Sequence, residues 1–225
     1  MGHALAIDTS TPLVSVALRT DSGQIVEHAC DPSQLLAARP AHARELLVAA
    51  HALLTARGLR FGDLAEVCVG IGPGGYTGLR IGIASARGLA TALDLPVRPV
   101  DSLAALARGI PGEARLAAID ARRGELFCRL EVGDGEVVWD AHVADPEDVA
   151  QRLRDAGMRV RAAGDGALRY RALLETAGAE VEPESSPAHL VHGRFLFELA
   201  ARVEPVEAAA VSPRYLREPD AEPRR

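Results

Sequence analysis

Two copies of a short pattern restrict the folds that this chain can adopt. Residues 6–18 begin Ala-Ile-Asp-Thr-Ser, and residues 118–130 begin Ala-Ile-Asp-Ala-Arg. In each copy an apolar strand ends in an aspartate, a tight turn follows, and a second strand runs back. Self-similarity of this kind indicates that one structural unit occurs twice. The 225 residues suffice for two small domains, and we place their boundary in the Gly- and Pro-containing segment 108–113.

The expected elements follow a similar order in both halves. Strands are expected at 3–8, 13–19, 24–29, 64–70, 96–100, 118–130 (two strands around a turn), 136–141 and 159–163. Helices are expected at 41–56, 76–93, from 102, and at 146–156, 167–177 and 188–202. Three meandering strands, then helix, strand, helix and strand, form the ribonuclease-H-like unit, duplicated in actin-like ATPases and sugar kinases. We therefore predict an α/β fold with mixed sheets: a first domain at 1–109, a second, reduced domain at 110–217, and a disordered tail at 218–225.

Composition excludes several chemistries. The chain contains no lysine, so a Schiff base, a P-loop lysine and a lysine general base are excluded. Its net charge of −6, with cations spread along the chain, argues against tight nucleic-acid binding by this chain alone. Cys30, Cys68 and Cys128 lie far apart, which predicts free thiols without a disulfide or metal site. No apolar run reaches the ~20 residues of a membrane span, and a signal-peptide pattern is absent, so we expect a cytoplasmic location.

A glycine-rich loop, Gly-Ile-Gly-Pro-Gly-Gly at 70–75, matches G-x-G-x-x-G between a strand and a helix. Taken alone, this pattern indicates dinucleotide binding. However, its strand is not the first of the sheet, and Pro73 removes an N–H that would bind pyrophosphate. We favour a tight turn that needs glycine dihedrals, with an anion held at the helix N-terminus as the alternative.

The helix expected at 76–93 contains Gly78, Gly82 and Gly88, and most of its other positions are small. Each interior glycine costs about 1 kcal/mol of helix stability relative to alanine. Gly78 and Gly82 are four residues apart and share one face. A small-residue surface of this kind predicts close approach by another helix, either within the core or from a second chain.

The segment Ile-Gly-Pro-Gly-Gly-Tyr-Thr-Gly-Leu-Arg-Ile-Gly at 71–82 resembles the G-P-G-S-F-T-G-x-R-I-G segment of the TsaB family, also called YeaZ. Residues 5–10, 118–125 and 213–217 resemble that family's opening strand, its A-I-D-A-R-x-G-E segment and its closing P-x-Y-L-R. The matches run in order along nearly the whole chain. Gly75 and Tyr76 stand where the family usually has Ser and Phe.

The resemblance implies an actin-like fold and a non-catalytic role. TsaB pairs with its catalytic paralogue TsaD through its first two helices, can homodimerise through the same surface, and is joined by the ATPase TsaE. The complex transfers threonylcarbamoyl to N6 of the adenosine beside the tRNA anticodon, so tRNA is expected to meet this chain only within the complex. The implied partner interface comprises His42, Leu46, Ala50, Tyr76, Thr77, Gly78, Arg80, Ile81, Gly82 and Ser85.

The positions of the histidines favour a chain that has neither a metal site nor catalytic residues. TsaD-type subunits hold a metal with H-x-x-x-H on the first long helix, where both imidazoles share one face. Here the residue four positions after His42 is Leu46, and the next histidine is His51. His189 and His192 lie three apart on a later helix, and we interpret them as part of a solvated face.

Two aspartates leave alternatives open. Asp8 and Asp120 stand where kinases of this fold place carboxylates for magnesium and phosphate, but we favour aspartates that cap their own turns. The candidate phosphate contacts are Asp8, Thr9, Ser10, Gly74 and Gly75. No cofactor is expected in the isolated chain, and a nucleotide at the partner interface stays open. An ATP-dependent kinase is the alternative function; a nuclease would need several converging carboxylates, of which only Asp8 is well placed.

Overall fold

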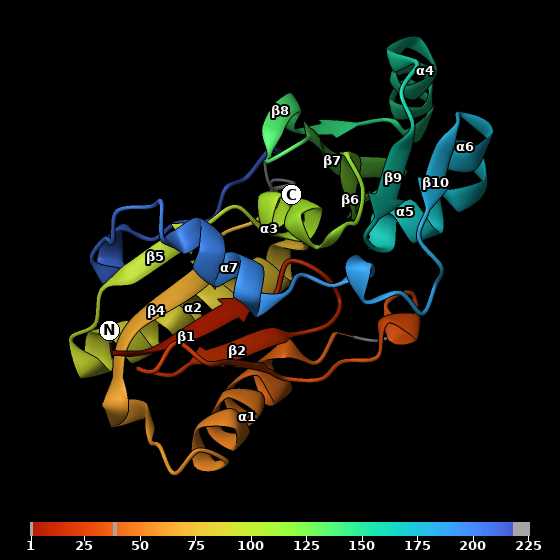
Figure 1. Ribbon diagram of the computed structural model, residues 1–225. Helices are drawn as coiled ribbons and strands as arrows, with labels where there is room; N and C mark the ends of the chain where they lie inside the picture. The colour runs from red at the N-terminus through yellow and green to blue at the C-terminus, as the bar shows by residue number, and fades with distance from the viewer. Residues whose placement is uncertain (1, 38–39, 218–225) are drawn as a thin grey trace, which may run out of the picture.

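The computed structural model describes residues 2–37 and 40–217, which form two mixed five-stranded sheets (Figure 1). The first sheet contains β1 (His3–Asp8), β2 (Ser15–Arg19), β3 (Ile25–Glu27), β4 (Leu64–Gly70) and β5 (Val97–Val100). The second contains β6 (Ala114–Arg122), β7 (Glu125–Val132), β8 (Glu136–Ala144), β9 (Val160–Ala163) and β10 (Ala179–Val181).

The two sheets have the same topology. The first has the order β3-β2-β1-β4-β5, and the second, written from the corresponding edge, β8-β7-β6-β9-β10. β1 is antiparallel to β2 and parallel to β4, and β6 is likewise antiparallel to β7 and parallel to β9. The aspartates of the repeated pattern, Asp8 and Asp120, lie at or near the ends of the two central strands. The predicted duplication and the actin-like α/β fold class are confirmed.

Helices separate and cover the sheets. They are α1 (His42–Thr55), α2 (Tyr76–Leu93), α3 (Ser102–Gly109), α4 (Pro146–Ala156), α5 (Asp165–Arg169), α6 (Arg171–Thr176) and α7 (Gly193–Ala200). Short 3₁₀ turns occur at Pro32–Gln34, Phe61–Asp63, Pro187–His189 and Ala208–Ala210.

Alternating side chains of β1 show how these layers form. Leu5 and Ile7 point into a core shared with α1 and α2, whereas Ala4 and Ala6 point into a core shared with α3 and α7. This second core also contains Ile119 of β6, and α3 joins the two sheets through it, because α3 packs on β6 and β7 and on α7, which covers the first sheet. A third core joins the far face of the second sheet to α4, α5 and α6, at the upper right of Figure 1.

The second half differs from expectation in three places. The helix expected at 167–177 is divided into α5 and α6 at Tyr170, where the backbone leaves the helical region (φ −108°). The helix expected at 188–202 begins only at Gly193, after a 3₁₀ turn. The short strand β10 had not been predicted.

His189 corrects a prediction, because it does not lie on a solvated face. It is fully buried, its Nδ1 accepts a hydrogen bond from the Gly164 amide, and its Nε2 donates to the carbonyl of Glu182. His192 precedes α7 and contacts Glu27 of β3.

The C-terminal part of the chain returns to the first sheet. Helix α7 packs on β1, β2, β4 and β5. Val211 belongs to the core under α1 and α2, and Arg217 then forms an ion pair with Glu125 of β7. The predicted division at 109/110 stays a prediction, and the tail expected at 218–225 lies outside the described residues.

All three cysteines are free, as predicted. Cys68 and Cys128 are buried in the sheets, and burial raises the pKa of each thiol to about 12. Among the described helices, none combines the length and apolarity required to cross a bilayer.

Candidate functional site

The turn after β1 is closed by its own aspartate. Asp8 Oδ1 accepts hydrogen bonds from the amide of Ser10 at 2.8 Å and from its hydroxyl at 2.6 Å. Asp8 Oδ2 accepts from the hydroxyl of Ser102, at the start of α3, at 2.5 Å. Burial is the largest influence on this carboxyl and raises its pKa. The favoured interpretation of Asp8, an aspartate that caps its own turn, agrees with this geometry.

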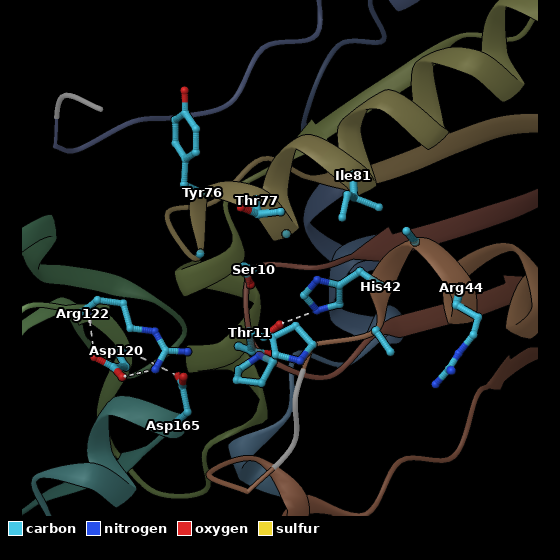
Figure 2. Close-up of a pocket in the computed structure, with 16 residues that line it drawn as sticks. Ser10, Thr11, His42, Arg44, Tyr76, Thr77, Ile81, Asp120, Arg122 and Asp165 are labelled. Carbon is cyan, nitrogen blue, oxygen red and sulfur yellow. Dashed lines mark hydrogen bonds and ion pairs between the residues drawn. The ribbon is translucent and has the colours of Figure 1, made fainter. Parts of the chain in front are cut away.

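The rest of this turn is bonded to α1 and α2. The Thr9 hydroxyl donates to the carbonyl of Gly78 at 2.8 Å, and the Gly75 amide donates to the carbonyl of Ser10 at 2.9 Å. His42 Nε2 lies 2.9 Å from the carbonyl of Thr11, so it donates a proton there (Figure 2). The first turns of both helices are therefore tied to one loop.

The glycine loop is tight because it packs against the same turn. Gly72 has φ +98°, in the region that favours glycine. A Cβ on Gly74 would lie 2.4 Å from the carbonyl oxygen of Ser10, and one on Gly70 would lie 1.7 Å from Asp8 Oδ2. The tight-turn interpretation accounts for these glycines.

Two of the predicted phosphate contacts, Asp8 and Thr9, therefore need correction. Asp8, Thr9 and Ser10 are 1%, 1% and 2% exposed, and their polar side chains bond within the chain. Gly74 is pressed against Ser10, and the Gly75 amide is already used. Asp8 and Thr9 could contact a phosphate only after the turn had opened. Ser10, Gly74 and Gly75 line cavities, and Gly75 is exposed, so a phosphate contact at these three residues stays a prediction.

The second copy of the pattern is also closed by its aspartate. Asp120 Oδ1 accepts from the amide of Arg122 at 2.8 Å, and Oδ2 forms ion pairs with Arg122 at 3.1 Å and Arg169 at 3.0 Å. Asp165 lies beside it, buried, and Oδ1 accepts from the Asp120 amide at 3.3 Å. Burial raises the pKa of Asp165 to about 6.

A cavity of about 640 Å³ separates the two turns (Figure 2). Ser10, Thr11, His42 and Tyr76 line it from the first half. Asp120, Arg122 and Asp165 line it from the second half. Within residues 2–37 and 40–217, no three His, Cys, Asp or Glu side chains are grouped as metal ligands.

Half of the predicted partner interface is inside the protein. Leu46 and Ala50 belong to the core on the first sheet, and His42 is 5% exposed between α1 and the β1–β2 turn. Gly78 and Gly82 are buried against Thr9. These five residues cannot contact a partner directly, because contacts within the chain already cover them.

The other predicted interface residues lie nearer the surface. Tyr76, Thr77 and Arg80 are exposed, while Ile81 and Ser85 are partly buried. The ring of Tyr76 stacks on Tyr215 with centroids 5.3 Å apart, and Arg80 lies over the Tyr76 ring. The N-terminal end of α2 is thus partly covered by the C-terminal segment.

Other exposed residues on α1 and α2 had been missed. Leu47 and Val48 of α1 are 44% and 66% exposed. Ala84 and Gly88 of α2 are also exposed, and a Cβ on Gly88 would meet no atom within 4 Å. The helical periodicity of α1 could have identified them, because when Leu46 and Ala50 face the core, Leu47 and Val48 face outward.

Comparisons with known proteins agree along nearly the whole chain. The family profile described as "TsaD: tRNA N6-adenosine threonylcarbamoyltransferase" matches residues 36–173. The tRNA threonylcarbamoyladenosine biosynthesis protein TsaB of Escherichia coli is 35% identical over 67% of this chain and 65% of its own length. TsaB of Bacillus subtilis is 30% identical over 97% of this chain and 95% of its own length. The solved structure of YeaZ from Pseudomonas aeruginosa superposes with a TM-score of 0.79 at 33% identity, over 96% of this chain and 100% of that one.

Proposed function

The chain belongs to the TsaB family, and on that premise we propose that it is the non-catalytic, partner-activating subunit of a tRNA-modifying complex. Its pathway is tRNA threonylcarbamoyladenosine biosynthesis, as the names of its relatives state. The complex transfers threonylcarbamoyl to N6 of the adenosine next to the anticodon. A TsaD-type subunit carries out the chemistry, and a TsaE-type ATPase joins the pair.

The observation that carries this proposal is the outer surface of α1 and α2. Leu47 and Val48 are exposed on α1, and Ala84 and Gly88 are exposed small residues on α2, which contacts α1. Neighbouring exposed apolar side chains on a soluble domain commonly mark a protein interface. A glycine in a helix interior costs about 1 kcal/mol, and no contact within this chain requires Gly88. Close approach of a partner helix would require it.

His42 supports a non-catalytic role. It occupies the position of the first histidine in the TsaD-type H-x-x-x-H pattern. Its Nε2 donates to the carbonyl of Thr11, which leaves only Nδ1 with a lone pair. The second position of the pattern is Leu46, which is 1% exposed in the core. We therefore assign the metal-dependent chemistry to the TsaD-type partner.

Relatedness to the catalytic subunit supports the mode of pairing. The TsaD profile covers α1 and α2 of this chain. Two chains that share this helix pair can pack pair against pair, as copies of one chain do in an isologous dimer. The homodimer and the heterodimer then use one surface, so each excludes the other. No nucleotide is assigned to the isolated chain, and one held between the subunits is compatible with the proposal.

Reconstitution tests the proposal directly. tRNA, the TsaD-type and TsaE-type subunits and the enzyme that makes threonylcarbamoyl-adenylate are combined, and this chain is added or omitted. We expect modification only when both this chain and the TsaD-type subunit are present. Modification by this chain without TsaD, or equal activity of TsaD alone, would overturn the proposal. A parallel assay of ATP turnover by the isolated chain tests the kinase alternative.

A further inference from the structure

We infer that Thr9 and His42 are positioning residues, which fix the spacing between α1 and α2 and so the shape of the partner surface. Neither residue can touch a partner, because their exposed fractions are 1% and 5%. The inference rests on the proposed function, since it concerns the surface through which the TsaD-type subunit would bind.

Thr9 sets the distance between α2 and the first sheet. Its hydroxyl donates to the carbonyl of Gly78 at 2.8 Å. A Cβ on Gly82 would lie only 2.2 Å from Thr9 Oγ1, and one on Gly78 would lie 2.3 Å from the Thr9 carbonyl oxygen. Both distances are far below van der Waals contact, so α2 can rest on Thr9 only where these positions are glycine. The two glycines thus serve contact within the chain.

His42 fixes α1 relative to the same turn. Its ring donates to the Thr11 carbonyl at 2.9 Å, and a Cβ on Gly78 would lie 2.9 Å from the ring carbon Cε1. The imidazole therefore fills the space between the first turn of α2 and the β1–β2 turn. The same three consecutive residues, Thr9 to Thr11, therefore hold both helices in place, in addition to the contacts between the helices themselves.

The spacing matters because the proposed partner surface spans two helices. Leu47 and Val48 belong to α1, whereas Ala84 and Gly88 belong to α2. Well-packed interfaces are as dense as protein interiors, so a displacement of one helix by about 1 Å leaves gaps or overlaps. A change at Thr9 should therefore act at the partner surface without contacting the partner.

A rescue experiment tests this arrangement. Gly82→Ala places a methyl group against Thr9 Oγ1 and should weaken binding of the purified TsaD-type subunit about tenfold or more. Thr9→Ala removes that oxygen, leaving Cβ at 3.3 Å, but it also removes the hydrogen bond to the Gly78 carbonyl. The double variant Thr9→Ala/Gly82→Ala should therefore recover most, but not all, of the affinity that Gly82→Ala loses. Thr9→Ser keeps the hydroxyl and should bind TsaD nearly as wild type does.

Two controls separate positioning from loss of stability. Val149→Ala truncates a buried residue of α4, in the core of the second sheet, and should lower stability without changing the affinity for TsaD. Hydrogen exchange of the isolated chain should show faster exchange in α1 and α2 for Gly82→Ala, reversed in the double variant.

The outcomes distinguish the two proposals. If wild type does not bind the TsaD-type subunit, the proposed function fails. If wild type binds and Gly82→Ala binds equally well, or the double variant remains as weak as Gly82→Ala, the positioning role is refuted. Exchange that rises uniformly over both sheets, or does not change in α1 and α2, refutes the role without any partner present.

Discussion

Replacing Gly88 by alanine should have opposite effects on the isolated chain and on its association. Gly88 lies inside the 18-residue helix α2, and a Cβ there meets no atom within 4 Å. Alanine therefore adds no clash and should raise the free energy of unfolding by about 1 kcal/mol, because it restricts the unfolded chain and suits the helix. For a chain of this size that corresponds to an increase in Tm of about 2–4 °C.

The same methyl group would stand on the surface proposed to meet the TsaD-type subunit. If a partner helix packs against this glycine, the methyl group should weaken association about tenfold, the cost of overpacking a tight contact. Unfolding is measured by circular dichroism at two protein concentrations, because self-association would make the apparent stability depend on concentration. Binding to TsaD is measured by titration calorimetry.

Gly58 offers a matched control. A Cβ on Gly58 also meets no atom, but its φ is +68°, so Gly58→Ala should destabilise the chain by about 1 kcal/mol and leave TsaD binding unchanged. A destabilised Gly88→Ala variant would refute the helix argument. A stabilised variant that binds TsaD as wild type does would show that Gly88 lies outside the interface.

Three further predictions follow from exposure and burial. Val48→Glu should abolish binding to the TsaD-type subunit in gel filtration with little change in Tm, whereas Val138→Glu, equally a charge on an exposed valine but on β8, should leave binding intact. Burial raises the pKa of Asp165 to about 6, above its ordinary value of 3.8, so the folded chain holds this proton longer and the free energy of unfolding falls as the pH rises between these values. Asp165→Asn should remove that fall and raise the free energy of unfolding at neutral pH by about 1–3 kcal/mol, which urea titrations across this range would measure, and an unchanged pH profile would contradict it. A maleimide should label Cys30 first in the folded chain, because burial raises the pKa of Cys68 and Cys128 to about 12; rapid labelling of either would contradict the buried thiols.

Local sequence patterns predicted the helices and strands well where the hydrophobic periodicity and the turn-forming residues indicated the same boundaries. The helix expected at 76–93 and the strand expected at 64–70 have the predicted bounds, because glycines and a change of period mark their ends. β10 has only three residues and too little pattern to be recognised. His189 was placed wrongly because its partner, the Gly164 amide, is 25 residues away, and a helical spacing of histidines contains no information about such a bond.

The candidate site was predicted in outline but not residue by residue. Gly78 and Gly82 were included in the partner interface, with packing within the core as the alternative, and their neighbour is Thr9, which is 69 residues from Gly78 in the sequence. A small-residue helix face looks the same whether a distant loop or a partner covers it. For α1 the helical phase contained the necessary information, but Leu46 and Ala50 were assigned to the partner interface, and the exposed Leu47 and Val48 were missed.

The return of α7 to the first sheet has a consequence for the order in which the chain can fold during synthesis. Ala4, Ala6 and Ala17 are fully buried in the core that includes α7, which begins at Gly193. One face of the first sheet therefore stays incompletely covered until α7 has left the ribosome. The 93 residues between the end of β5 at Val100 and Gly193 take roughly 5–20 seconds at synthesis rates of about 5–20 residues per second, and this apolar surface is open to solvent for that time. Nascent chains stalled before residue 193 should consequently bind chaperones that the finished protein does not.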